Sequence, residues 1–329
     1  MDLIDKNFKK CNIFDIKSKY LIMKIFDPLK SQIFFRIIKY NKKIKNKLDI
    51  KIEEFLGIEI ELIPKENTCG HFIQKNNKYF HIYFNDENEE IKRNYLTKED
   101  NVNKIRIIIN KEVDSFEKLF DNCKCIKKIS FIKSFRNNIT NMRYMFKNCK
   151  SLEELNFLNF NTKNVKYMGG MFYNCSSLKE IDLSNFNTEN VIDMSFMFKY
   201  CFSLKELDLS NFSGKQLKYI SSMFSNCTSL KKLNLSNFYI DKPIATDYMF
   251  SKCGSLETLD LSNLHIKNIK NMYCMFSGCN KLKELDLSNL KTIYRVNLDY
   301  IFEGCSSLKQ VKSSDIRIKY GINDLCLIC

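Results

Sequence analysis

Eight cysteines recur at a constant interval of 26 residues. They are Cys123, Cys149, Cys175, Cys201, Cys227, Cys253, Cys279 and Cys305. Thiolates can act as nucleophiles or metal ligands, and stacked repeats would bring neighbouring thiols within disulfide range. A fixed period of about 20–50 residues also marks repeat proteins, in which a buried cysteine packs as a small apolar side chain. We favour the packing interpretation, because a disulfide in every pair of neighbours would distort a regular stack.

Two periodicities within each block predict the elements that hold these cysteines. Ile181 and Leu183 alternate with polar residues, which is the pattern of a half-buried strand. The second half of the block has apolar residues at i, i+3, i+4 and i+7, on one face of a helix: Met194, Met197, Phe198 and Cys201. The sequence therefore predicts an α/β repeat with one short strand and one short helix per 26 residues. Such units are stable only when they stack.

The stretch CSSLKEIDLSNFNTENVIDMSFMFKYCFSLKELDLSNF, residues 175–212, resembles the BspA-like leucine-rich repeat family, and residues 279–290 match it as closely. The resemblance covers about residues 113–316 without a change of repeat length. It implies a leucine-rich repeat solenoid that binds proteins or surfaces, but the family consensus carries no binding residues that can be transferred. Two blocks depart from the pattern. Residues 240–248 place Pro243 where other blocks have valine, and residues 293–302 replace Met-Phe by Ile301-Phe302.

The 329 residues suffice for more than one domain. We predict a helical, F-box-like or capping region at 1–57, a small β-rich region and N-terminal cap at 58–112, the solenoid at 113–316 and a tail at 317–329. Within the α+β N-terminal region, residues 58–63, 78–84 and 104–109 alternate as strands do. The last of these, together with Val113, Phe116 and Phe120, resembles an incomplete first repeat that caps the array.

Residues 15–50 faintly resemble an F-box, through IFDPL at 25–29 and IIKYNKKIKNKL at 37–48. The leading Leu-Pro and the trailing Trp of that motif are absent. An F-box would make the chain a ubiquitin-ligase substrate adaptor that recruits a Skp-type protein. A helical cap or platform is the alternative that we favour.

Composition narrows the choice of compartment and partner. The net charge is +15, but the abundance of Lys, Asn and Ile is typical of an AT-rich genome, so nucleic acid is an unlikely partner on this evidence. No apolar run is long enough to span a membrane, and MDLIDKNFKKCN lacks the apolar core of a signal peptide. We therefore predict a cytoplasmic protein with reduced thiols.

The outward-facing strand positions carry acids, serines and one asparagine, and they form the predicted concave binding face. The candidate residues are Glu154, Glu180, Asp182, Ser184, Glu206, Asp208, Ser210, Asn234, Asp260, Glu284 and Asp286. A negative stripe would attract a basic protein partner, although flanking lysines weaken its field. The alternative is that the repeat consensus simply places acids there. The oligomeric state is left open.

The sequence CLIC at 326–329 has the C-a-a-X form that precedes prenylation, here of Cys326. A lipid there, helped by upstream basic residues, would tether the chain to the cytoplasmic face of a membrane. The alternatives are a frayed tail or a zinc half-site, and three histidines without metal-ligand spacing make a poor zinc case.

No motif for catalysis or nucleotide binding occurs, so we predict no enzyme activity, no cofactor and no metal. The expected function is a non-catalytic protein–protein interaction module that uses the strand face. The alternatives are the ubiquitin-ligase adaptor and an adhesin-like surface protein.

Overall fold

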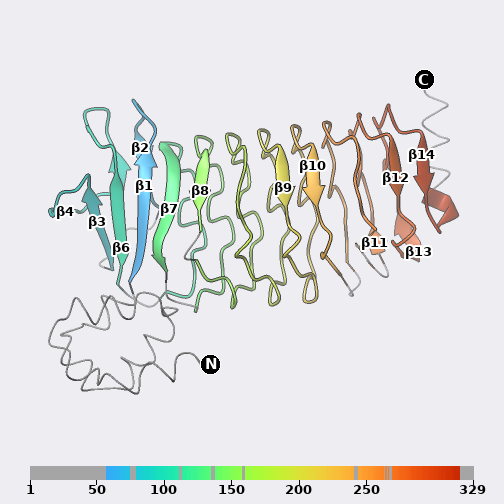
Figure 1. Ribbon diagram of the computed structural model, residues 1–329, viewed down its shortest axis with the longest axis horizontal. Helices are drawn as coiled ribbons and strands as arrows, with labels where there is room; N and C mark the ends of the chain where they lie inside the picture. Colours follow the sequence, from blue (N-terminus) through green and yellow to red (C-terminus); the bar gives the residue numbers. More distant parts are fainter. Residues whose placement is uncertain are drawn as a thin grey trace, which may run out of the picture. The chain divides into compact units, whose positions relative to one another are not determined.

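The computed structural model describes residues 57–74, 79–110, 113–134, 138–157, 160–240, 244–262, 264, 266 and 269–318. The chain divides into two units, Met1–Gly57 and Ile58–Cys329. The F-box-like residues 15–50, Pro243 and Cys326 lie outside the described residues. The second unit stacks the chain into successive coils, so the predicted repeat fold is confirmed (Figure 1).

An antiparallel sheet begins the second unit and merges into the coils. Its strands are β1 (Ile58–Pro64), β3 (Phe80–Phe84), β4 (Glu90–Ile91), β6 (Ile105–Ile109), β7 (Ile126–Ser134) and β8 (Glu154–Asn156), in the order β4-β3-β6-β1-β7-β8. The three predicted strands are confirmed as β1, β3 and β6, each with alternating burial. However, β6 pairs antiparallel with β1 and β3, so it is not an incomplete repeat. Parallel pairing begins between β7 and β8.

The remaining strands are short. β2 (Gly70–His71) pairs with β5 (Tyr95–Leu96), and the other pairs join successive coils. β9 (Glu206–Asp208) lies parallel to β10 (Lys232–Asn234), β11 (Ile269–Asn271) to β13 (Thr292–Asn297), and β12 (Glu284–Asp286) to β14 (Gln310–Lys312). Each strand of β9, β10 and β12 therefore meets the strand one repeat away, in register.

The predicted helix in each repeat is wrong. Where Met194–Cys201 was expected to be helical, Phe196 and Tyr200 have φ of +59° and +65°, the left-handed region. The segment instead forms successive turns: Lys199 N–H donates to the Phe196 carbonyl at 3.1 Å. Alternate amides point out of the coil, so that Phe198 N–H donates to the Met223 carbonyl of the next coil at 2.9 Å. Among the described residues, only 316–318 form a helical turn.

We call this segment the turn ribbon: residues 116–123 and their equivalents every 26 residues up to 298–305. In each coil at least three amides of the ribbon donate to carbonyls 25 residues further on, beginning with Lys118, Phe120 and Asn122 and ending with Cys274, Phe276 and Gly278. In most coils the first residue of the ribbon makes the same kind of bond, as Met194 N–H does to the Tyr219 carbonyl. A β-turn also places side chains three and four residues apart on one side, so its apolar spacing imitates that of a helix. Hydrogen bonds between coils favour successive turns over a helix, and the sequence pattern does not reveal these bonds.

The ribbon supplies most of the repeating core. Phenylalanine rings from successive coils stack face to face, with ring centroids 5.3–5.9 Å apart. They belong to Phe146, Phe172, Phe198, Phe224, Phe250, Phe276 and Phe302. Ile301, which replaces methionine in the last of these coils, is also buried.

The cysteine that follows each phenylalanine is buried as well and has a fixed partner. The Cys201 thiol donates to the Phe172 carbonyl at 3.1 Å, and the same bond recurs in the neighbouring coils. Burial raises the pKa of Cys201 to about 12. A thiol held protonated in this way serves as a hydrogen-bond donor and a packing group rather than as a nucleophile.

Candidate functional site

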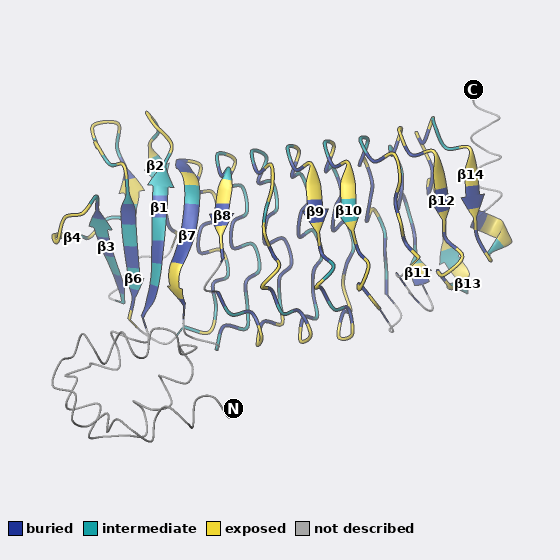
Figure 2. Cartoon of the chain, in the orientation of Figure 1, coloured by how far each residue is buried: buried dark blue, intermediate teal, exposed yellow. Residues whose placement is uncertain are grey.

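The strand face is the side of the stack that carries the strands of the repeats. Figure 2 shows exposed residues along β8, β9, β10 and β12. Ten of the eleven predicted binding residues are exposed, and Ser210 is half-buried. Leu155 and Leu207, which alternate with them, are buried beneath the face. The alternation predicted from the sequence thus sets which side chains reach solvent.

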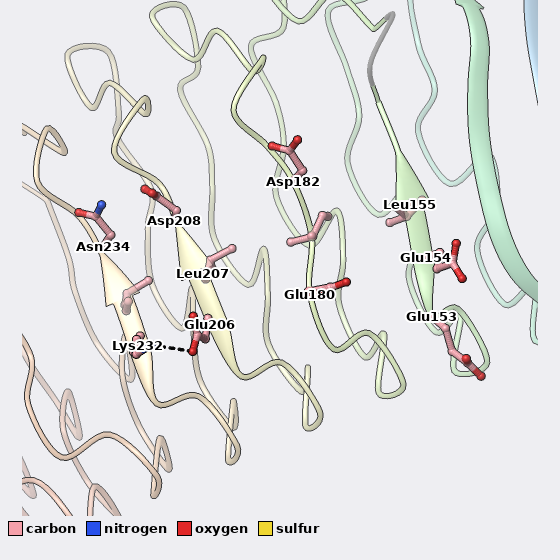
Figure 3. A pocket seen from close by; sticks show the side chains of 12 residues that line it. Glu153, Glu154, Leu155, Glu180, Asp182, Glu206, Leu207, Asp208, Lys232 and Asn234 are labelled. Atoms are coloured by element: carbon pink, nitrogen blue, oxygen red, sulfur yellow. Dashed lines mark hydrogen bonds and ion pairs between the residues drawn. The ribbon is translucent and has the colours of Figure 1, made fainter.

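Six predicted residues come together around one hollow of about 750 Å³ that spans four coils. They are Glu154, Glu180, Asp182, Glu206, Asp208 and Asn234 (Figure 3). Ser184 lines an adjoining smaller hollow. Asp260, Glu284 and Asp286 line a separate hollow further along the stack. Ser210 lines none of these three hollows.

The aspartates of the strand face have a role in the fold itself. The Asp182 carboxylate accepts a bond from the backbone N–H of Ser184 at 2.9 Å, and Asp208 does the same for Ser210 at 2.8 Å. Hydrogen bonding from the side chain and backbone of Ser184 holds the pKa of Asp182 below its usual range, and the backbone and side chain of Ser210 do the same for Asp208. Asn234 makes the equivalent bond to Ser236 without a charge. At this repeat position the fold requires a side chain, Asp or Asn, that can close an Asx-turn. The negative charge of the aspartates is not needed for that bond.

Glu154, Glu180 and Glu206 make no such turn bonds to described residues, and of these three the first and the last are paired with lysines. Lys128 Nζ lies 2.8 Å from the Glu154 carboxylate, and Lys232 Nζ lies 2.9 Å from that of Glu206. The hydrogen bond from Lys128 lowers the pKa of Glu154. Between these pairs, Glu180 has no hydrogen bond or ion pair through its side chain to any described residue. Figure 3 shows it between Glu154 and Glu206.

Sequence reasoning missed three features of this hollow. Glu153 and Lys232 line it, and half-buried Ile181 and Leu233 form part of its floor. The signal was available, because Lys128 and Lys232 occupy the same repeat position as Glu154, Glu180 and Glu206, separated by multiples of 26 residues. Comparing that position across repeats would have shown a run of three glutamates closed by lysines at both ends. Lys179 and Lys205, two of the lysines that flank the acidic positions in the sequence, line a neighbouring hollow.

Among the residues that the structure describes, there is neither a metal-binding cluster nor a membrane-spanning helix. The described part of the chain contains no group of three or more His, Cys, Asp or Glu side chains arranged to hold a metal ion. It also contains no helix with the length and apolar character needed to cross a membrane. The arrangement on the strand face is an open polar surface over an apolar floor, which suits non-covalent recognition.

Comparison with known proteins places the chain in a family. No curated protein sequence matches it. A leucine-rich repeat protein from Bacteroides ovatus ATCC 8483 is similar in structure, with 21% identity, a TM-score of 0.26, and coverage of 65% of this chain and 66%, just under two thirds, of that chain. A leucine-rich cell surface protein from Faecalibacterium prausnitzii A2-165 has 15% identity, a TM-score of 0.23, and coverage of 65% and 86%.

The family model described as "Mycoplasma protein of unknown function, DUF285" matches residues 114–238 and 204–315. Together these matches span residues 114–315, more than half of the 329 residues. They coincide with the coils that carry the turn ribbons and the strand face. The chain belongs to this DUF285 family of repeat proteins.

Proposed function

We propose that the chain is a non-catalytic binding module that captures a protein partner on the strand face. The observation that carries the proposal is Glu180 in the hollow, whose side chain pairs with no described residue and which lies between two glutamates that are each paired with a lysine. Like charges directly opposite one another on neighbouring strands destabilise a sheet. Glu154, Glu180 and Glu206 occupy the same position of three successive coils, so their like charges repel and folding alone does not favour the run.

The chemistry of the hollow favours a partner that presents a lysine or arginine side chain. Lys128 and Lys232 show that an ammonium group can approach this row to hydrogen-bond distance. An exposed ion pair contributes little free energy by itself, roughly 0–1 kcal/mol, so charge would set specificity and association rate. The apolar floor at Ile181, Leu207 and Leu233 would supply contact area.

The test is affinity capture with the full chain, compared with the double variant Glu180→Lys/Glu206→Lys. These positions are chosen because Asp182 and Asp208 hold turns, so their replacement would disturb the fold. We expect proteins enriched by the unaltered chain to be lost by the variant in quantitative mass spectrometry. Glu284→Lys, on the same row but outside this hollow, is the matched control and should retain them. Equal enrichment by the double variant would overturn the proposal.

Two finer predictions concern residues outside those that the structure describes. A cytoplasmic location with prenylation of Cys326 would be supported if the chain moved from membrane to soluble fractions on Cys326→Ser replacement. A ubiquitin-ligase adaptor role would be supported if residues 15–50 were required for binding a Skp-type protein. Both are compatible with partner capture on the strand face, because they involve other parts of the sequence. The adhesin-like alternative instead requires the chain at a cell surface, which surface labelling would detect.

A further inference from the structure

Partly or largely exposed aromatic side chains recur on the turn ribbons, one in every second coil. They are Tyr144, Phe196, Tyr248 and Tyr300, and each has a φ between +55° and +59°. Bulky residues rarely adopt this left-handed region, so the backbone alone does not favour an aromatic residue here. The coils between them have a small residue at this position, such as Gly170. A Cβ on Gly170 would lie 2.3 Å from the Tyr144 ring, so that ring needs a small residue in the next coil.

The earlier coils show what these rings bind. Lys147 Nζ lies 5.3 Å from the centre of the Tyr144 ring, and Lys199 Nζ lies 5.4 Å from the centre of the Phe196 ring. Both distances are within the range of a cation–π interaction, about 6 Å. In the later coils, other residue types stand at the repeat position of these two lysines. They are Ser251, Ser277 and Glu303.

An arginine of the chain makes a similar contact and adds a carboxylate to it. The Arg143 guanidinium lies over the Tyr167 ring, 4.2 Å from its centre, and Arg143 Nη2 lies 2.6 Å from the Asp193 carboxylate. Tyr167 and Asp193 occupy the same repeat position in successive coils, and their backbones pair in parallel. A tyrosine and an aspartate one coil apart can therefore bind one guanidinium, the ring by its face and the carboxylate by charge-assisted hydrogen bonds.

The same two residue types stand one coil apart again near the end of the stack. Tyr273 and Asp299 share one repeat position, which Asp247 occupies one coil earlier. The Tyr273 ring packs edge to face against Tyr248 and Tyr300, with centroid distances of 5.3 Å and 5.7 Å. Tyr248 and Tyr300 are 38% and 58% exposed, and Asp299 is exposed. We call Tyr248, Tyr273 and Tyr300 the tyrosine row, and it has an aspartate one coil to either side of its middle ring.

The charge beside the tyrosine row is negative. Burial raises the pKa of the Cys274 thiol, and the charges of Glu303 and Asp299 add to this effect. Cys274 directly follows Tyr273, so the field of both carboxylates reaches the row. The chain has a net charge of +15, but charges on exposed groups are largely screened beyond about 8 Å at physiological ionic strength. The nearby carboxylates therefore determine the charge that the row attracts.

We propose that the tyrosine row, with Asp247 and Asp299, is a second docking surface that takes an arginine side chain from a basic segment of a partner protein. The guanidinium stacks on the exposed rings and donates to an aspartate, as Arg143 does on Tyr167 and Asp193. Arginine suits the row better than lysine, because its planar group stacks on rings and binds carboxylates through two N–H groups. This surface lies on the ribbon side and does not depend on partner capture by the strand face.

The test is the binding of a fluorescein-labelled hexa-arginine peptide to the full chain, measured by fluorescence anisotropy. The background is the double variant Glu180→Lys/Glu206→Lys, so that binding to the acidic strand face does not contribute and the two proposals fail separately. In this background, Tyr300→Leu and Asp299→Asn should each weaken peptide binding about two- to fivefold. Tyr300→Phe keeps the ring and should leave peptide binding unchanged.

The matched control is Tyr294→Leu, because Tyr294 is 89% exposed on β13 and lies outside the tyrosine row. It should leave peptide binding unchanged. Circular dichroism with thermal unfolding shows whether each variant is folded. Tyr248→Leu, which removes another ring of the row, takes the place of Tyr300→Leu if that variant does not fold.

Several outcomes would overturn the proposal. One is failure of the peptide to bind the background variant, or binding that Tyr300→Leu and Tyr248→Leu leave unchanged. Another is equal weakening by Tyr300→Leu and Tyr300→Phe, or by Tyr300→Leu and Tyr294→Leu, because either would show that the rings of the row are not what the peptide recognises. Hexa-lysine that binds as tightly as hexa-arginine would remove the case for a guanidinium. Binding of neutral cellohexaose that is lost in Tyr300→Leu would assign the row to sugar stacking instead.

Discussion

The two sides of a coil hold the stack together by different means. On the ribbon side, at least three amides per coil donate to the next coil throughout residues 118–278, and the phenylalanine rings stack beneath them. On the strand side, residues 180–182 form no strand at all, although β8 and β9 lie one repeat to either side. The ribbon therefore fixes the register of the coils. The outward side chains of the strand side can therefore differ from coil to coil without loss of register, and such side chains can recognise a partner.

The largest expected effect comes from truncating a buried side chain of the turn ribbon. It is compared with the truncation of an apolar side chain on the strand side. Phe198→Ala should lower the free energy of unfolding by about 3–5 kcal/mol, because the ring is fully buried between Phe172 and Phe224. Ile181→Ala should have a clearly smaller effect, since that side chain is only half-buried in the floor of the hollow. Urea denaturation measures both. Equal losses of unfolding free energy would contradict the conclusion that the ribbon side contributes more to stability than the strand side.

A second test concerns the last coil, where side-chain contacts of Asp315 and Arg317 with Thr292 add to the pairing of β14 with β12. The Asp315 carboxylate accepts from Thr292 and pairs with Arg317, and this lowers its pKa from 3.8 to about 2. A lowered pKa in the folded state gives stability above the unfolded value that is lost as the pH falls from about 4 to about 2. Because solvent screens the pair, we expect roughly 1 kcal/mol.

The measurement compares the unfolding free energy of the unaltered chain with that of Asp315→Asn across this pH window. The difference should be present at neutral pH and should shrink to zero as Asp315 becomes protonated. A difference that stayed constant down to pH 2 would show that the carboxylate charge contributes nothing to the last coil.

A smaller effect tests the backbone of the ribbon. Lys252 has a φ of +61° and is exposed, whereas the equivalent position one repeat later is Gly278. Lys252→Gly should relieve left-handed strain and raise stability by about 0.5 kcal/mol, the strain being partly offset by the entropy of glycine. Lys231→Gly, on the strand side, should lower stability, as glycine does in an extended segment. Thermal unfolding of the two variants gives the sign of each change.

The sequence predicted the strand side better than the ribbon side, and the reason is physical. Alternation with a period of two directly reports which side chains a strand buries, so the exposure of Glu180 and Glu206 followed from residue type. The spacing of Met194, Met197, Phe198 and Cys201 is shared by a helix and by successive turns. Positive φ at Phe196 and Tyr200 decides for turns, yet neither residue type favours that conformation. Hydrogen bonds between coils stabilise it, and these are non-local.

The hollow was predicted only in part for a related reason. The sequence identified which acids face outward, but it did not separate the two rows by role. Asp182 closes a turn and Glu180 does not, because a one-carbon-longer side chain does not close an Asx-turn. The pairing of Lys232 with Glu206 depends on strand register, which appears only when β9 and β10 are placed side by side.

The smallest expected effect bears most directly on why the glutamate row exists. Glu180 lies between Glu154 and Glu206 at the same repeat position, so Glu180→Lys should stabilise the fold by a few tenths of a kcal/mol. Exposed Glu189 has the opposite setting, between Lys163 and Lys215, so Glu189→Lys should destabilise by a similar amount. Both changes should shrink as salt is added, because the charges are exposed. If Glu180→Lys gains stability while it loses partner capture, the glutamate is retained for binding at the expense of the fold. A loss of stability on Glu180→Lys would instead show that the row is part of the scaffold, and it would remove the ground for separating the two sides.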